Sequence, residues 1–164
     1  MDSFLNVFWL YLPAFLANGA PVVIRHVPGF RNWNTPLYAS LLGTNKTWRG
    51  MISGIIVGAL TGGIQFFFSD QWVWIGMTWG ALLGFGALVG DAVESFVKRR
   101  LHIAPGKALP IWDGIDYILG ALLLGAIWYV PSWQEILFLL ILAPLLSLLS
   151  NIGAYFLKIK DVWY

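Results

Sequence analysis

The sequence has 164 residues, of which 59% are hydrophobic and only 11% are charged, less than half the charge of a typical soluble domain. The length fits one domain, and the composition predicts an integral membrane protein with several spans. The absence of cysteine excludes a disulfide framework, a thiolate zinc centre and a thiol nucleophile.

Five apolar runs are long enough, or nearly long enough, to cross a bilayer as helices. They cover residues about 4–24, 50–69, 72–92, 115–131 and 134–157. The connections at 25–49 and 93–114 are long and basic, whereas the other two are short turns. We therefore expect residues 1–164 to form a single all-α transmembrane domain with about five spans.

The distribution of positive charge predicts the orientation of these spans. Every Lys and Arg lies in 25–49, in 93–114 or after residue 157. By the positive-inside rule, both long loops and the C-terminus are cytoplasmic and the N-terminus is outside. We expect a multi-pass protein of the cell membrane with its active site at the cytoplasmic face.

The first apolar run contains Pro13, Asn18, Gly19 and Pro21, which should interrupt a helix. Two interpretations stay open at this point. The run could be a kinked helix that packs on its neighbours, or Asn18 and the residues after it could line a polar cleft that admits substrate.

The second and third runs carry glycine at every fourth position, which allows helix backbones to approach closely in lipid. These glycines are Gly50, Gly54, Gly58 and Gly62, and then Gly76, Gly80 and Gly84. The partner surface is either another span or another subunit, so a homodimer is compatible with the pattern.

Two cations stand just before the second run, within NKTWRG at 45–50. Thr44, Asn45 and Thr47 beside them offer polar groups and a helix cap. Lys46 and Arg49 could anchor the span at the membrane surface, or they could bind a phosphate group.

The stretch from Gly90 to Asp116 concentrates the charge of the chain. Asp91, Glu94, Ser95 and Lys98 are spaced i, i+3, i+4 and i+7, so on a helix they share one face. Asp113 and Asp116 repeat the i, i+3 spacing at the start of the next run. Four carboxylates offer the all-oxygen ligands that Mg²⁺ prefers, and nearby cations suit phosphates. This pattern predicts a phosphoryl- or nucleotidyl-transfer site, although a solvated network of ion pairs is the plainer alternative.

Several segments together resemble one family of membrane enzymes. They are ANGAPV (17–22), NKTWRG (45–50), GDAVESFVKRR (90–100), the spacing of Pro110, Asp113 and Asp116, and the run YILGALLLG after it. The chain resembles CTP-dependent cytidylyltransferases that activate lipid phosphates, in particular the CDP-archaeol synthase family. Arg49 replaces an acid of the related phosphatidate enzymes, and Gly114 replaces an arginine, which favours the archaeol type.

The resemblance implies that a lipid phosphate attacks CTP, giving a CDP-lipid and pyrophosphate, with Mg²⁺ as cofactor. The implied partners are CTP, an isoprenoid ether lipid phosphate such as 2,3-bis-O-geranylgeranylglycerol 1-phosphate, and membrane lipids, with no nucleic acid. The expected metal ligands are Asp91, Glu94, Asp113 and Asp116. Asp91, Asp113 and Lys98 are the expected catalytic residues. The expected substrate-binding residues are Asn18, Lys46, Arg49, Ser95, Lys98 and Arg99.

Three other functions remain to be separated from this one. A phosphatidate cytidylyltransferase would use the same chemistry on an ester lipid. A CDP-alcohol phosphotransferase is suggested by Asp113-Gly114, but the rest of that family's pattern is absent. A small ion transporter is disfavoured because the acidic pairs lie at one membrane face rather than within the spans.

Overall fold

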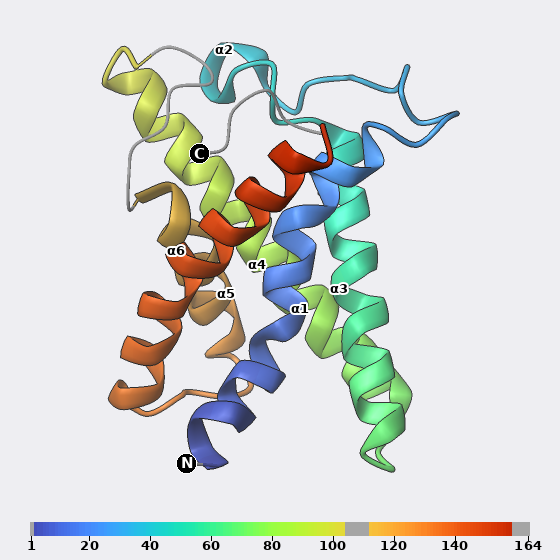
Figure 1. Cartoon of the computed structure of the whole chain (residues 1–164), viewed down its shortest axis with the longest axis vertical. Helices are drawn as coiled ribbons and strands as arrows, with labels where there is room; N and C mark the ends of the chain where they lie inside the picture. Colours follow the sequence, from blue (N-terminus) through green and yellow to red (C-terminus); the bar gives the residue numbers. More distant parts are fainter. Residues whose placement is uncertain (1, 104–111, 159–164) are drawn as a thin grey trace.

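The computed structural model describes residues 2–103 and 112–158, and its regular structure there is helical apart from one isolated bridge between Pro36 and Thr47. The helices are α1 (Asp2–Ile24), α2 (Ala39–Leu42), α3 (Trp48–Phe68), α4 (Val73–Arg100), α5 (Trp112–Gly125) and α6 (Trp133–Phe156). The predicted all-α class is therefore confirmed. Figure 1 shows the long helices side by side, with the loop after α1, the short α2 and the end of α4 gathered at the end opposite the N-terminus.

Four described helices, α1, α3, α4 and α6, are long and apolar enough to cross a membrane by length and composition. Helix α5 has 14 residues, so it rises about 21 Å, less than the roughly 30 Å of a bilayer core. It ends at Gly125 instead of continuing to 131 as expected, because the chain turns at 126–128. The fourth predicted span, 115–131, is thus a shorter helix than its apolar run suggested.

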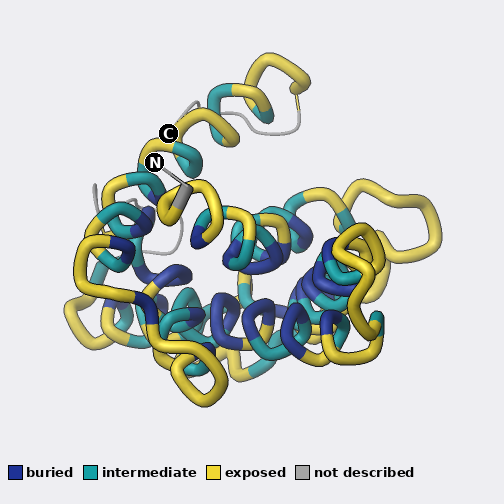
Figure 2. Tube along the Cα trace, turned by 90° about the horizontal axis from the view of Figure 1, so that it is seen from below, coloured by how far each residue is buried: buried dark blue, intermediate teal, exposed yellow. Residues whose placement is uncertain are grey.

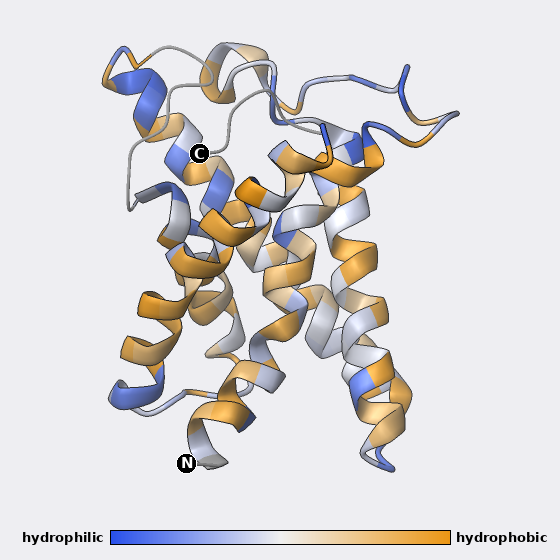
Figure 3. Ribbon diagram, viewed as in Figure 1, coloured by the Kyte–Doolittle hydropathy of each residue, from blue (hydrophilic) through white to orange (hydrophobic). Residues whose placement is uncertain are grey.

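Helix α4 continues to Arg100, well into the segment expected as loop 93–114. The acidic and basic residues of 91–100 are therefore helical, as their spacing predicted. Figure 3 shows that this end of α4 is hydrophilic, whereas the middle of the bundle is mostly apolar. One helix thus passes from the apolar bundle into the polar end of the molecule.

The expected interruption of α1 does not occur, because the helix continues through Pro13 and Pro21. Pro13 has no N–H to offer the carbonyl of Trp9, four residues earlier. The side-chain amide of Gln65, which is buried in α3, donates a hydrogen bond to that carbonyl. This contact supports the interpretation of α1 as a helix that packs on its neighbours.

The glycine ridges of α3 and α4 face each other. A Cβ on Gly62 would lie 2.0 Å from the carbonyl oxygen of Gly76, and one on Gly58 would lie 2.4 Å from that of Gly80. No side chain fits in either place, so the two backbones touch. The partner of each ridge is therefore another span of the same chain.

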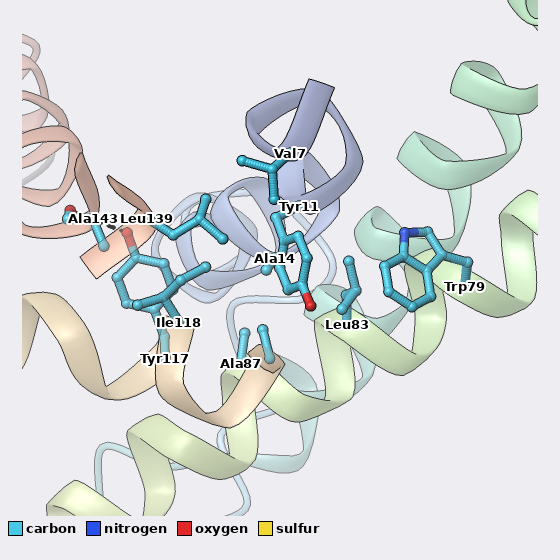
Figure 4. Close-up of a cluster of buried hydrophobic side chains, with 11 residues drawn as sticks. Val7, Tyr11, Ala14, Trp79, Leu83, Ala87, Tyr117, Ile118, Leu139 and Ala143 are labelled. Carbon is cyan, nitrogen blue, oxygen red and sulfur yellow. Dashed lines mark hydrogen bonds between the residues drawn. The ribbon is translucent and has the colours of Figure 1, made fainter. Parts of the chain in front are cut away.

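The apolar core lies where α1, α4, α5 and α6 meet (Figure 4). Figure 2 shows the buried parts of the chain toward the inside of the bundle. Tyr11 of α1 packs edge-on against Trp79 of α4, with ring centroids 5.8 Å apart. Tyr117 of α5 donates a hydrogen bond of 3.1 Å to the carbonyl of Ala143 in α6. The first contact joins α1 to α4, and the second joins α5 to α6.

Candidate active site

Helices α4 and α5 bring three carboxylates together in what we call the acidic cluster, Asp91, Glu94 and Asp116. One carboxylate oxygen from each residue lies within 4.8 Å of the others. Asp91 and Glu94 share a face of α4 because they are three residues apart. Asp116 approaches them from the first turns of α5. Acids separated by 25 positions in the sequence therefore form one site.

A backbone contact sets the spacing of this cluster. A Cβ on Gly90 would lie 2.2 Å from the backbone oxygen of Asp116, and one on Gly120 would lie 2.9 Å from the Cα of Gly90. Helix α5 can approach α4 this closely only because both positions lack a side chain. Gly90 therefore positions Asp116 next to Asp91, its own neighbour in sequence.

Asp116 is the most enclosed member of the cluster, with 8% of its surface exposed. Its Oδ1 is buried and has no hydrogen-bond partner among the described residues. A buried carboxylate oxygen without a donor is unfavourable unless a cation is bound. The donor set, which consists only of carboxylate oxygens, fits Mg²⁺ or a similar hard cation.

Two lysines pair with the acids at this site. Lys46 contacts Asp91, and Lys98 contacts Glu94. Lys98 also lies 2.7 Å from Asp113 Oδ1 and is largely shielded from solvent. Four carboxylates against two ammonium groups leave an excess of two negative charges, which one divalent cation would neutralise.

Asp113 lies beside the acidic cluster, at the start of α5. Its Oδ1 contacts Lys98 and its carboxyl group neighbours that of Glu94, but it is not one of the three carboxylates within 4.8 Å of one another. Its role as a metal ligand stays a prediction. The sequence grouped all four acids because both pairs have the same spacing. Both acids of the first pair, Asp91 and Glu94, belong to the cluster, whereas only Asp116 of the second pair does. The packing of α5 on α4 decides this.

The loop after α1 carries Lys46 to the acidic cluster. Leu37 N–H donates to the carbonyl of Lys46 at 2.7 Å, and Trp48 N–H donates to that of Thr35 at 3.1 Å. The hydroxyl of Thr47 accepts a hydrogen bond of 3.2 Å from Gly50 N–H, which confirms the predicted cap of α3. The backbone on both sides of Lys46 is thus fixed.

Arg49 is placed differently from Lys46. Its guanidinium is buried and donates to the carbonyls of Phe30 and Arg31, at 2.9 and 3.2 Å. In this arrangement Arg49 holds the loop onto the start of α3. The Nε of Arg49 is buried and has no hydrogen-bond partner among the described residues. The contact of Arg49 with a phosphate therefore stays a prediction.

The remaining predicted residues, Ser95, Arg99 and Asn18, are not members of the acidic cluster. Ser95 is buried on the same stripe of α4 as Glu94. Arg99 lines a separate cavity with residues of α2. Asn18 is half-buried on α1. The structure therefore brings together Lys46, Asp91, Glu94, Lys98, Asp113 and Asp116 of the predicted set.

Sequence reasoning missed Gly90 and Gly120 as positioning residues. Gly86 and Gly90 are four residues apart, the same spacing as the ridge at 76, 80 and 84, but shifted by two positions. That shift turns the second pair toward a different neighbour, α5. The change of register was the signal that a second helix packs there.

Three comparisons relate the chain to known proteins. A profile of the CarS-like family, described as CDP-archaeol synthase, matches residues 1–164. Similar proteins include the CDP-archaeol synthases of Thermococcus kodakarensis, at 34% identity over 99% of this chain and 97% of the relative, and of Methanocaldococcus jannaschii, at 36% identity over 95% and 94%. A solved intramembrane enzyme of archaeal membrane lipid biosynthesis is 31% identical, with a TM-score of 0.78, and the match covers 91% of this chain and 94% of that one.

Proposed function

Because the chain belongs to the CDP-archaeol synthase family, we propose that its acidic cluster and the two adjacent lysines carry out cytidylyl transfer. The chain is a membrane-embedded CTP-dependent cytidylyltransferase. The observation that supports this location is the group of three carboxylates within 4.8 Å, one of them with a buried oxygen that lacks a donor.

The reaction transfers CMP from CTP to an archaeal lipid phosphate and gives CDP-archaeol and pyrophosphate. We assign 2,3-bis-O-geranylgeranylglycerol 1-phosphate as the substrate. A phosphate oxygen of the lipid attacks the α-phosphorus of CTP, the bond from that phosphorus to the bridging oxygen of the β-phosphate breaks, and pyrophosphate leaves. No protein nucleophile is needed, so the contribution of the protein is positioning and neutralisation of charge.

Asp91, Glu94 and Asp116 would hold the divalent metal, which we assign as Mg²⁺. When bound, Mg²⁺ supplies positive charge to the phosphate oxygens and to the departing pyrophosphate. The three carboxylates come from two helices fixed by the contact at Gly90. Little reorganisation of these ligands is therefore needed when the metal binds.

Lys98 and Lys46 would bind phosphate groups beside the metal. Each ammonium group has three N–H donors. Lys98 uses part of this capacity on Glu94 and Asp113, which hold its side chain in place between α4 and α5. We therefore assign Asp113 to orient Lys98. Lys46 contacts Asp91 from the loop and is well placed to bind substrate phosphate beside that ligand.

We place this site at the cytoplasmic face of the cell membrane, because the basic loop after α1 and the basic end of α4 lie at the same end of the bundle (Figure 1). The chain contains no cysteine, so single cysteines give unambiguous labelling. In intact cells, Asp70→Cys should react with an impermeant maleimide, whereas Phe30→Cys should react only after permeabilisation. The reverse pattern would contradict this orientation.

The direct test is a transfer assay with the purified full chain. We expect CTP and the geranylgeranyl ether lipid phosphate to give a CDP-lipid and pyrophosphate, and a chelator to stop the reaction until Mg²⁺ is restored. Phosphatidate supplied in parallel should be a poorer substrate. Equal turnover in the presence of the chelator would contradict the metal assignment, and a preference for phosphatidate would contradict the lipid assignment.

A further inference from the structure

A second polar site lies between α2 and the end of α4. Here a cavity of about 380 Å³, which we call the basic cavity, is lined by Ser40, Leu41, Phe96, Arg99, Arg100 and His102. It contains two guanidinium groups and an imidazole but no acid. A ligand that binds here is therefore an anion.

The basic cavity is not an extension of the acidic cluster. Around the axis of α4, the residues that line the cavity are centred roughly 160° from Asp91, Glu94 and Lys98, at 100° per residue. Helix α2 packs on this other side of α4. The two sites therefore use opposite faces of one helix.

The two arginines of the cavity have no acidic partner among the described residues. Neither Arg99 nor Arg100 forms a salt bridge with a carboxylate there. The Nε of Arg99 is buried and has no hydrogen-bond partner there. The guanidinium of Arg100 lies 5.1 Å from the centre of the Phe96 ring, which holds it at the cavity wall. These guanidinium groups are therefore available to an anionic ligand.

A turn at the end of α4 places His102 in the same wall. His102 N–H donates to the carbonyl of Arg99 and Ile103 N–H donates to that of Lys98, the two hydrogen bonds of a Schellman motif. His102 has φ of 58°, a conformation that glycine adopts far more readily. A histidine therefore occupies a position where this backbone conformation favours glycine.

Apolar side chains also line the cavity. Leu41 of α2 is 40% exposed, and Phe96 of α4 is half-buried. These side chains would contact acyl or isoprenoid chains, while the arginines contact a charged group at the membrane surface. We propose that the basic cavity binds the phosphate of an anionic membrane lipid, at a site separate from the transfer site.

The test is lipid binding to the purified full chain, measured by native mass spectrometry in neutral detergent. Wild-type protein should retain phosphatidylglycerol at least tenfold more tightly than phosphatidylcholine. The double variant Arg99→Gln, Arg100→Gln should lose this preference, since each substitution removes a charge-assisted contact. Lys158→Gln, which removes an exposed cation after α6, is the matched control and should retain it.

A second variant separates a binding defect from a folding defect. His102→Gly suits the left-handed turn, so the end of α4 should remain intact while the imidazole is lost. We expect weaker binding of phosphatidylglycerol together with an unchanged melting temperature. Unchanged binding in both this variant and the double variant would overturn the proposal.

Two further measurements distinguish the source of the phosphate. Inorganic phosphate at the same concentration should not displace phosphatidylglycerol, because it lacks the chains that contact the apolar side chains of the cavity. Displacement would show that the cavity recognises free phosphate and would overturn the lipid assignment. The lipid assignment would also be overturned if the double variant lost affinity for CTP while its lipid binding was unchanged.

Discussion

The two ends of the bundle both hold buried acids, but these acids have different surroundings. At the N-terminal end, Glu135 accepts hydrogen bonds from Ser3 Oγ at 2.5 Å and from the backbone and hydroxyl of Ser132 at 2.8 and 2.9 Å. At the other end, Asp116 Oδ1 is buried without a hydrogen-bond partner among the described residues. Burial alone therefore does not distinguish a structural acid from a functional one.

The number of donors around the carboxylate makes the distinction. Glu135 forms the capping box of α6 and also links α6 to α1, so the protein satisfies its oxygens. The acidic cluster has more negative charge than its two lysines neutralise. An acid that the protein leaves incompletely satisfied is available for a metal or a substrate.

The largest expected effect is at the incompletely satisfied acid. Asp116→Asn retains size and polarity but removes the charge that Mg²⁺ requires. We expect a loss of at least about 100-fold in cytidylyl transfer, with no rescue by excess CTP. Asp91→Asn combined with Asp116→Asn should be little worse than either alone, since ligands of one metal act as a unit.

The measurement for these acids is initial rate in detergent, with Mg²⁺ varied, beside a melting curve for each variant. Substantial Mg²⁺-dependent turnover in Asp116→Asn would remove this residue from the metal site. If Glu135→Gln reduced the rate equally, the contrast between the two ends would be wrong.

The next effect concerns the spacing of the ligands rather than their charge. Gly90→Ala introduces a Cβ where the Asp116 carbonyl lies 2.2 Å away, so α5 must move. We expect transfer to fall at least about tenfold, because a displacement of about 1 Å already misaligns a reacting site. Gly153→Ala in α6 is the matched control, since nothing lies within 4 Å of its new Cβ.

The rates of both glycine variants should be measured over a range of Mg²⁺ concentrations. A higher Mg²⁺ requirement in Gly90→Ala alone would show that the helix contact sets the ligand geometry. Normal activity and metal dependence in Gly90→Ala would contradict the positioning role.

Lys46→Ala should have an effect of similar or smaller size. If Lys46 binds phosphate, its loss removes one charge-assisted contact, worth about 1.5–3 kcal/mol. The Michaelis constant for CTP should then rise, or turnover should fall, by tenfold or more. Lys158→Ala controls for the loss of a basic residue, and near-normal kinetics in Lys46→Ala would favour the role of a membrane anchor.

The smallest effect on activity is expected at the satisfied acid. Glu135→Gln weakens the capping box and the link to Ser3, which should cost about 1–2 kcal/mol of stability. The turnover of the folded protein should be unchanged. Thermal unfolding and specific activity measured on one preparation test both statements together.

The sequence predicted most of the architecture because apolar runs and basic loops are local signals. It did not predict the early end of α5, since residues 126–130 are as apolar as a span. Tertiary contacts determine that boundary: Trp128 stacks on Trp79 with centroids 6.0 Å apart, and Tyr129 donates a hydrogen bond to Glu135.

The candidate site was predicted in composition but not in arrangement. Spacing on one helix correctly placed Asp91 and Glu94 together, because a helix fixes which residues share a face. It did not show that Asp113 contacts Lys98 or that Arg49 holds the loop. Both outcomes depend on how separate segments pack, and a single sequence carries no local signal for this.

The hydrogen bond from Gln65 to the carbonyl of Trp9 has a consequence for biogenesis. An unpaired carbonyl in lipid costs several kcal/mol, so α1 is incompletely stabilised in the bilayer until α3 has been synthesised and inserted. A ribosome must add more than fifty residues after Trp9 before its partner emerges. During that interval we expect water, lipid headgroups or the insertion machinery to supply the missing hydrogen-bond donor to the Trp9 carbonyl. Once α3 has inserted, Gln65 supplies this donor within the membrane.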